Sequence, residues 1–175
     1  MVKLQEDTVM KYYFKEKFTF LFDRGELYDE AGNTAYTFQS TTVMFPEIHL
    51  YGRYGEIGMV QTRFAWFLNK YDLYLNGNYV DRLQQELTLF RPRLYLEEKG
   101  WTVQGDFMHW DYDIIDAEGN LVAQMDEELW HLTKHFVLNI YDEENEELIL
   151  LVMLGIFLKD KSASSNAGAA AASNH

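Results

Sequence analysis

Residues 142–159 read DEENEELILLVMLGIFLK, and this stretch decides how the rest of the chain folds. Acidic residues come first, an apolar run from Leu148 to Leu158 follows, and Lys159 comes last, an order that complements a helix dipole at both ends. The run has no polar stripe, so the helix must be surrounded by protein or lipid on every side. About 15 residues span roughly 22 Å, which is too short for a bilayer core of about 30 Å. We therefore predict a helix buried inside the protein.

The sequence before this helix repeats one phrase, in which an aromatic or aliphatic strand end is followed by a turn with Gly or Asn. The copies recur about every 20 to 23 residues, which is the length of two ordinary strands and a tight turn. Each copy predicts a β-hairpin, and the alternation of Leu83 with Arg82 and Gln84 predicts one buried and one solvated face. The phrases stand at 27–33, 50–55, 73–78, 94–100, 114–120 and, without a glycine, 138–142.

The number of predicted strands indicates where the helix lies in the fold. Five complete hairpins supply ten strands, and segments 9–21 and 134–141 supply a first and a last, which makes about twelve. A barrel of about eight strands fills itself with side chains, whereas a larger one encloses more space, which a helix about 10 Å across would fill. A ligand barrel with an external helix would need an amphipathic helix, and a propeller would need about 40 residues per blade. The predicted fold class is therefore mainly β: a closed barrel of about twelve antiparallel strands, in six hairpin-like repeats, around a central apolar C-terminal helix.

Composition limits the classes of protein to which the chain can belong. Its 175 residues, 47% of them hydrophobic, suit one globular domain. We expect a short N-terminal extension at 1–8, a single barrel domain at 9–159 and a disordered low-complexity tail at 160–175. The net charge of −13 disfavours nucleic acid as a partner. No signal peptide or transmembrane segment is recognisable, and the absence of cysteine fits a reducing compartment, so we expect a cytoplasmic location.

Four further phrases stand out beside the repeats and the final helix, namely 10–17 (MKYYFKEK), 28–33 (YDEAGN), 100–107 (GWTVQGDF) and 111–114 (DYDI). Over roughly residues 9 to 159 the chain thereby resembles the LURP-one-related family. The resemblance implies the tubby-like fold, a barrel around a central C-terminal helix that is shared with phospholipid scramblases. It implies no agreed biochemical activity and no catalytic residues. Tubby domains hold a phosphoinositide in a basic cavity, but no residue of that cavity can be matched here.

Basic residues are the only material for an anion site in so acidic a chain. Lys11, Lys15 and Lys17 share one face of a predicted strand, and Arg91 and Arg93 share one face of another. These five form a candidate anion patch that would hold a phosphate headgroup at one end of the barrel, and the alternative is a solvated outer surface. The other basic residues considered for such a site are Arg53, Arg63, Lys70, Arg82 and Lys99.

No motif in the sequence predicts a metal, a cofactor or a catalytic group. His131 and His135, downstream of Asp126, Glu127 and Glu128, have a spacing that would bind a metal on one helical face, but strand and bend are predicted there. There is also no Gly-rich phosphate loop and no Gly-x-Ser-x-Gly elbow.

We therefore expect a non-catalytic cytoplasmic binding or scaffold module, not an enzyme, that contacts a phospholipid headgroup or a protein partner. The alternative is a small-molecule carrier that uses a gap between the helix and the barrel wall. The sequence leaves the oligomeric state open.

Overall fold

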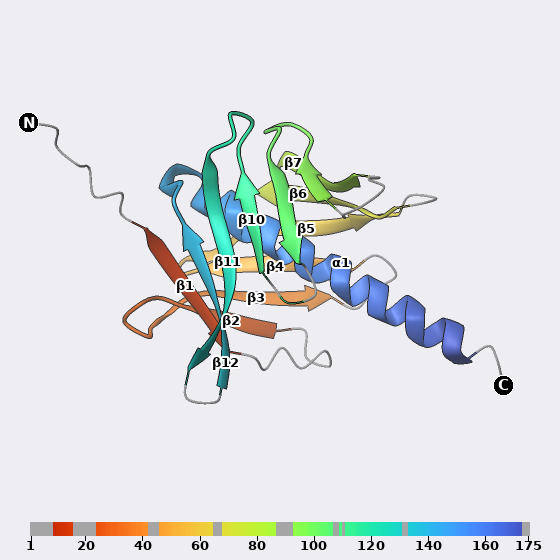
Figure 1. Cartoon of the computed structure of the whole chain (residues 1–175), viewed down its shortest axis with the longest axis horizontal. Helices are drawn as coiled ribbons and strands as arrows, with labels where there is room; N and C mark the ends of the chain where they lie inside the picture. Colours follow the sequence, from red (N-terminus) through yellow and green to blue (C-terminus); the bar gives the residue numbers. More distant parts are fainter. Residues whose placement is uncertain are drawn as a thin grey trace, which may run out of the picture.

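The computed structural model describes residues 9–15, 24–41, 46–64, 68–86, 93–106, 109, 111–130 and 133–172. The predicted extension at 1–8 lies outside them. The described residues form strands, a short 3₁₀ turn and one helix (Figure 1). In chain order these are β1 (Met10–Lys15), β2 (Arg24–Tyr28), β3 (Thr34–Thr41), β4 (Glu47–Gly52), β5 (Gly55–Arg63), β6 (Lys70–Leu75), β7 (Asn78–Glu86), β8 (Arg93–Leu96), β9 (Thr102–Asp106), β10 (Asp111–Ile115), β11 (Leu121–Trp130), β12 (Thr133–Ile140), η2 (Glu143–Asn145) and α1 (Glu146–Ala172).

The strands form one closed antiparallel barrel in which each strand pairs with its neighbours in the chain. The barrel closes where β1 pairs with β12 along Met10–Lys15 and with β2 at Tyr13 and Tyr28. The predicted twelve-stranded, mainly β barrel is confirmed.

Five hairpin turns lie at one end of the barrel, which we call the mouth. The turn between β6 and β7 has φ of 49° at Asn76 and 77° at Gly77, the positive values that an Asn-Gly hairpin requires. The first and fifth turns, DEAGN at 29–33 and DAEGN at 116–120, close in the same way. The aspartate Oδ1 accepts the backbone N–H of the final asparagine, at 2.8 Å in Asn33 and 2.7 Å in Asn120. The repeated phrases therefore mark equivalent turns, as predicted.

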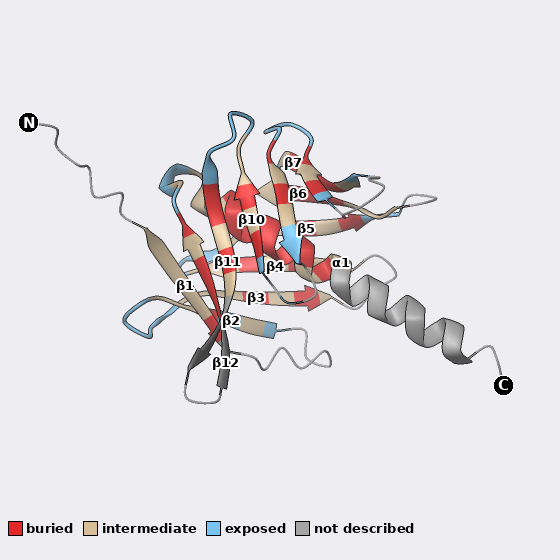
Figure 2. Cartoon of the chain, viewed as in Figure 1, coloured by how far each residue is buried: buried red, intermediate tan, exposed pale blue. Residues whose placement is uncertain are grey.

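Helix α1 enters the barrel at the mouth, and its apolar residues lie inside (Figures 1 and 2). Every residue from Leu148 to Ile156 is buried, with no exposed stripe, so the predicted central helix is confirmed. The hydroxyls of Tyr12 and Tyr36 both donate to Glu146 Oε1, at 2.5 and 2.6 Å, and hold the first turn of the helix to the wall. Burial and the Glu146 carboxylate raise the pKa of both tyrosines above the usual value.

The helix is longer than the sequence pattern indicates. The pattern places its end near Lys159, whereas α1 continues to Ala172. Five of the six residues from 167 to 172 are alanine, which has the highest helix propensity. A prediction from the spacing of apolar residues does not include helix propensity, so it ends the helix too early. Residues 173–175 lie outside the described part of the chain.

The two faces of the sheet depart from the predicted division into a buried and a solvated face. Leu83 is buried as predicted, but Asp81, two residues earlier on the same inner face, is also fully buried. Its carboxylate accepts the backbone N–H groups of Glu98 and Lys99, both at 2.9 Å, and fixes the turn between β8 and β9. On the outer face, Gln84 is only 7% exposed, although it was predicted to be solvated.

Candidate binding surface on the outer wall of the barrel

The outer face of three consecutive strands, β5, β6 and β7, gathers polar and aromatic side chains. Tyr71 and Leu73 of β6 belong to the core, so Asp72 between them faces outward. The register places Asp72 opposite Gln61 of β5 and Arg82 of β7. We call the result the outer-wall surface. It consists of Met59, Gln61 and Arg63 of β5, Lys70, Asp72 and Tyr74 of β6, and Tyr79, Arg82 and Gln84 of β7.

Asp72 is the centre of this surface. Its side chain is only 4% exposed, yet it lies on the outside of the barrel because two arginines cover it. Arg63 Nε donates to Oδ2 at 2.8 Å, and Arg82 Nε donates to Oδ1 at 2.6 Å. Burial acts to raise the pKa of Asp72, but the hydrogen bonds and charges of Arg82 and Arg63 outweigh it and lower the pKa below the usual value. The carboxylate is thus held ionised between two guanidinium groups.

The outer ends of the arginines are also held in place. Arg63 Nη2 donates to the Tyr74 hydroxyl at 3.2 Å, and Arg82 Nη1 lies 3.4 Å from Glu97 Oε2. Arg82 lies over the ring of Tyr79, 6.0 Å from its centroid, and Tyr79 packs edge-on against Tyr74. Contacts of this kind restrict the arginine rotamers, so the positive groups are positioned before any ligand arrives.

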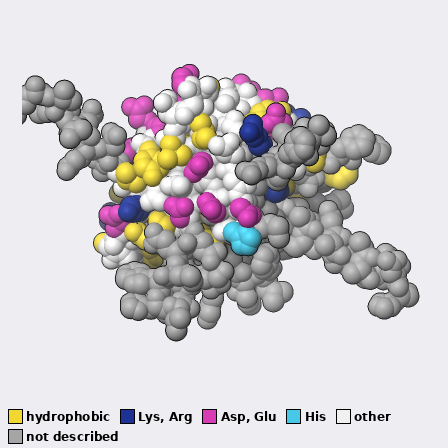
Figure 3. Space-filling view, in the orientation of Figure 1, with side chains coloured by type: hydrophobic (Ala, Val, Ile, Leu, Met, Phe, Trp, Pro, Cys, Tyr) yellow, Lys and Arg dark blue, Asp and Glu magenta, His cyan; other side chains and the backbone are white. Residues whose placement is uncertain are grey.

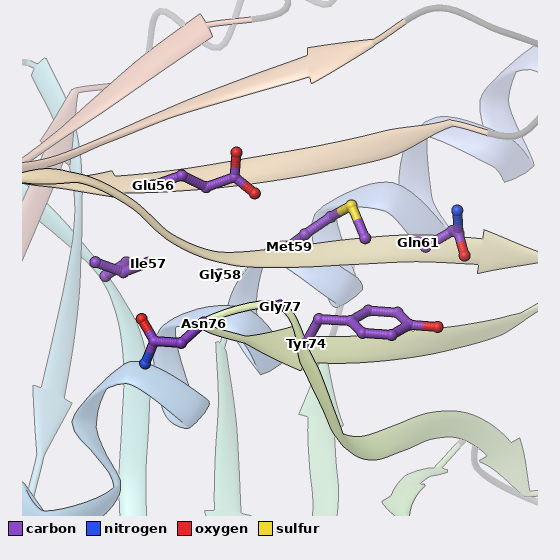
Figure 4. A pocket seen from close by; sticks show the side chains of 8 residues that line it. All are labelled: Glu56, Ile57, Gly58, Met59, Gln61, Tyr74, Asn76 and Gly77. Carbon is purple, nitrogen blue, oxygen red and sulfur yellow. The ribbon is translucent and has the colours of Figure 1, made fainter.

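A groove of about 490 Å³ runs beside this cluster, within the range of about 300–1,000 Å³ that is common for ligand pockets. Figure 4 shows Met59 and Gln61 rising from β5, with the ring of Tyr74 along β6. Tyr74 also accepts the hydrogen bond from Arg63, so the groove and the charged cluster are continuous. The full lining is Glu56, Ile57, Gly58, Met59, Gln61, Tyr74, Asn76 and Gly77.

A second hollow of about 390 Å³ lies at the mouth, where the start of the helix meets the barrel wall. Leu75, Val80 and Leu148 form its apolar part. Four glutamates of residues 143–147 also line it, and Lys99 crosses it to donate to Asn145 Oδ1 at 2.8 Å. A carrier that used a gap between the helix and the barrel wall would bind its ligand in this hollow. Below it the helix residues are buried without exposure, so the hollow is a shallow feature of the mouth.

Of the five residues in the candidate patch predicted from the sequence, the structure describes the side chains of Lys11 and Arg93, and these two lie far apart. Lys11 of β1 is half-buried at the mouth end, whereas Arg93 of β8 is exposed at the opposite end. Four strands separate β1 from β8 on one side of the barrel and six on the other. Lys17 and Arg91 lie outside the described residues, and of Lys15 only the backbone is described, opposite His135.

The cations that do gather, Arg63 and Arg82, come from different strands, with Lys70 beside them opposite Arg63. Same-strand alternation cannot reveal such a set. Cross-strand pairing counted from the Asn76-Gly77 turn would not have found it either, because Asp72 stands opposite Arg82 only through the register shift between Leu73 and Tyr74.

The structure describes only part of the residues on which the predictions about a histidine metal site and a membrane span depend. His131 lies outside the described residues, and of His135 only the backbone is described. Within the described ranges, no group of three or more His, Asp or Glu residues is arranged to hold a metal ion. Among the helices that the structure describes, none is both long and apolar enough to cross a bilayer.

Comparison with known proteins bears on the resemblance noted from the sequence. Neither the curated proteins nor the solved structures that were searched gave a match. A family model described as LURP-one-related matches residues 10–157, which run from the first residue of β1 into the buried part of α1. The match covers most of the 175 residues, and the chain therefore belongs to the LURP-one-related family.

Proposed function

We propose that this chain is a non-catalytic cytoplasmic binding module, and that a segment of a protein partner docks on the outer-wall surface. The observation that carries the proposal is the groove on β5 and β6, which adjoins a fixed set of Tyr and Arg side chains. Tyr, Arg and Met are enriched at protein interfaces, and binding energy concentrates in such residues when they are held in place.

Strands make this surface rigid. The groove is framed by paired β5 and β6, whose register runs without a shift from Gly58–Leu75 to Arg63–Lys70. Polar groups beside it are engaged with one another, since Gln61 donates to Glu47 at 2.5 Å and His49 lies 3.1 Å from Glu56. Polar side chains that are bonded to one another in this way stay fixed beside the groove. A fixed surface suits the binding of a ligand better than the transfer of a proton.

Charge favours a protein segment over a phospholipid membrane. The chain carries a net charge of −13, and acidic side chains are spread across the face seen in Figure 3. Glu56 lines the groove, and Glu97 lies against Arg82. A flat anionic bilayer would meet these carboxylates together with the arginines, whereas a narrow peptide contacts only a few groups at a time.

A site-specific photocrosslink tests the proposal. A photoreactive amino acid replaces Met59 in the full chain, and in a matched control it replaces Tyr54, which is 95% exposed in the turn between β4 and β5. The protein that crosslinks at 59 and not at 54 is then purified, and its binding to the unlabelled chain is measured. We expect Tyr74→Ala to weaken this binding about 10-fold or more, and Tyr54→Ala to leave it unchanged.

Two results would contradict the proposal. One is equal weakening by the two tyrosine substitutions. The other is binding of anionic vesicles, lost at high salt, when no protein crosslinks at position 59.

A further inference from the structure

We infer that Arg63 and Arg82 form an oxyanion fork, which holds the carboxylate or phosphate of an acidic side chain on the docked segment. The inference rests on the proposed function, because it names the chemistry that the outer-wall surface recognises. It follows from three features of the cluster, namely its charge, its unused donors and its shared tyrosine.

The first feature is an excess of positive charge. Two guanidiniums share the single carboxylate of Asp72, so the pair carries one positive charge more than Asp72 neutralises. Lys70 lies on the same face, opposite Arg63 in the register. Of the two arginines that share Asp72, Arg82 is the one that lies near Glu97, at 3.4 Å, and the Glu97 side chain is itself 43% exposed. Around Asp72 itself these three positive and two negative groups leave a net charge of +1 in a chain whose total is −13, whereas Glu56 and Glu47 lie on the groove side.

The second feature is the supply of hydrogen-bond donors. A guanidinium has five N–H groups in a fixed plane, which suits a carboxylate or a phosphate. Both arginines give Nε–H to Asp72 and one Nη N–H to a neighbour, Tyr74 or Glu97. Their other Nη N–H groups have no acceptor among the described residues. Arg63 is 53% exposed and Arg82 is 31% exposed, so these donors face outward from a buried anchor.

The third feature joins the fork to the groove. Tyr74 accepts a hydrogen bond from Arg63 and lines the groove together with Met59 and Ile57. An acidic side chain at the fork therefore places its neighbouring residue over an apolar floor. The recognised segment has an acidic residue beside an apolar one, and Asp72 acts as the positioning residue that holds both arginines ready.

Three degenerate peptide pools test the inference, identical except for a fixed central glutamate, phosphoserine or glutamine. Binding to the full chain is followed by the NMR signals of the arginine Nε–H groups and of the Met59 methyl group. We expect the glutamate or phosphoserine pool to shift Arg63 and Arg82 and to bind about 10-fold or more tightly than the glutamine pool. Whichever anionic pool binds more tightly identifies the oxyanion as a carboxylate or a phosphate.

The decisive variant is R63Q/D72N, which removes one cation and its buried anion together and leaves the net charge at −13. The new amide still offers Arg82 an acceptor, and a thermal melt confirms folding. This variant should lose the preference for anionic pools, whereas R53Q, at an exposed turn arginine, should keep it.

The outcomes separate the two proposals. Equal binding of all three pools, with the Met59 signal shifting each time, would overturn the fork and leave the docking surface standing. An anionic preference that survives in R63Q/D72N would also overturn the fork. If no pool shifts any outer-wall signal, the docking surface itself is refuted.

Discussion

Replacing Gly155 of the helix by alanine should have opposite effects in two backgrounds that differ only at Leu83. A Cβ at Gly155 would lie 2.8 Å from Cδ2 of Leu83 on β7, and the next atoms, in Val60 and Tyr71, lie at 3.8 and 4.0 Å. In the wild-type chain the added methyl group overfills the core, which costs about 1–3 kcal/mol. Replacing a glycine in a helix interior by alanine stabilises the helix by about 1 kcal/mol. The single variant should therefore range from neutral to about 2 kcal/mol less stable.

The Leu83→Ala background reverses the sign. Leu83 is fully buried, so its truncation alone should lower the free energy of unfolding by about 2–5 kcal/mol. The methyl group of Gly155→Ala then enters vacated space and keeps the gain in helix propensity, which should restore about 1–2 kcal/mol. The two substitutions should thus be coupled by about 1–4 kcal/mol.

Chemical denaturation, followed by tryptophan fluorescence and far-ultraviolet circular dichroism, measures all four chains of this cycle. The matched control combines Gly155→Ala with Leu27→Ala, because Leu27 is also fully buried but is not among the atoms within 4 Å of that Cβ. The control pair should be additive within about 0.5 kcal/mol. If Gly155→Ala has the same effect with and without Leu83, then Gly155 does not lie against Leu83.

Three further predictions follow from contacts near the mouth and the seam of the barrel. Asp81→Ala removes a fully buried carboxylate that accepts the part-buried N–H groups of Glu98 and Lys99, so it should lower the free energy of unfolding by about 1–3 kcal/mol, measured by denaturation. Because the pKa values of Tyr12 and Tyr36 are raised on folding, their contribution to stability is complete below the unfolded pKa of about 10 and is lost as pH rises above it. The chain with both tyrosines changed to Phe should be less stable near neutral pH and should show a shallower alkaline loss in denaturation midpoints, and equal slopes would exclude the mechanism. Finally, among the described residues the seam between β1 and β2 has one register pair whereas β11 and β12 share eight, so amides of β2 should exchange with deuterium sooner than those of β12.

The sequence was most informative where local physics decides the structure. The apolar run at 148–158 has no surface on which to lie except the inside of a barrel, and the structure buries it there. The turn glycines, such as Gly77, supply the positive φ that their turns need. Both features depend on residues close in the chain, so pattern and propensity sufficed to predict them.

The candidate binding surface depends on register, which the pattern reports poorly. A regular two-residue turn at Asn76-Gly77 pairs Leu75 with Asn78. If this pairing continued along both strands without interruption, Asp72 would stand opposite Asp81. A register shift between Leu73 and Tyr74 instead sets Asp72 opposite Arg82. This one-residue shift changes a repulsive pair of carboxylates into an ion pair.

The same shift explains what the repeated phrase does. Register shifts also fall between Leu27 and Tyr28, between Leu50 and Tyr51, and between Ile114 and Ile115, always in the last residues before a mouth turn. At four of the five mouth turns the repeated phrase is therefore a bulge followed by a turn, and the pairing of β8 with β9 has no such shift. Alternation along one strand groups cations of that strand, whereas bulged hairpins bring together cations from neighbouring strands.

The central claim is that a ligand binds outside the barrel because the helix already fills the inside. Methionine methyl groups report directly on both places, since Met59 lines the outer groove while Met125 and Met153 are buried in the core. With selectively labelled methionine methyl groups in the full chain, the glutamate-fixed peptide pool should shift the Met59 signal and leave those of Met125 and Met153 in place. A shift of Met125 or Met153 with Met59 unchanged would contradict the account, because the ligand would then lie between the helix and the wall.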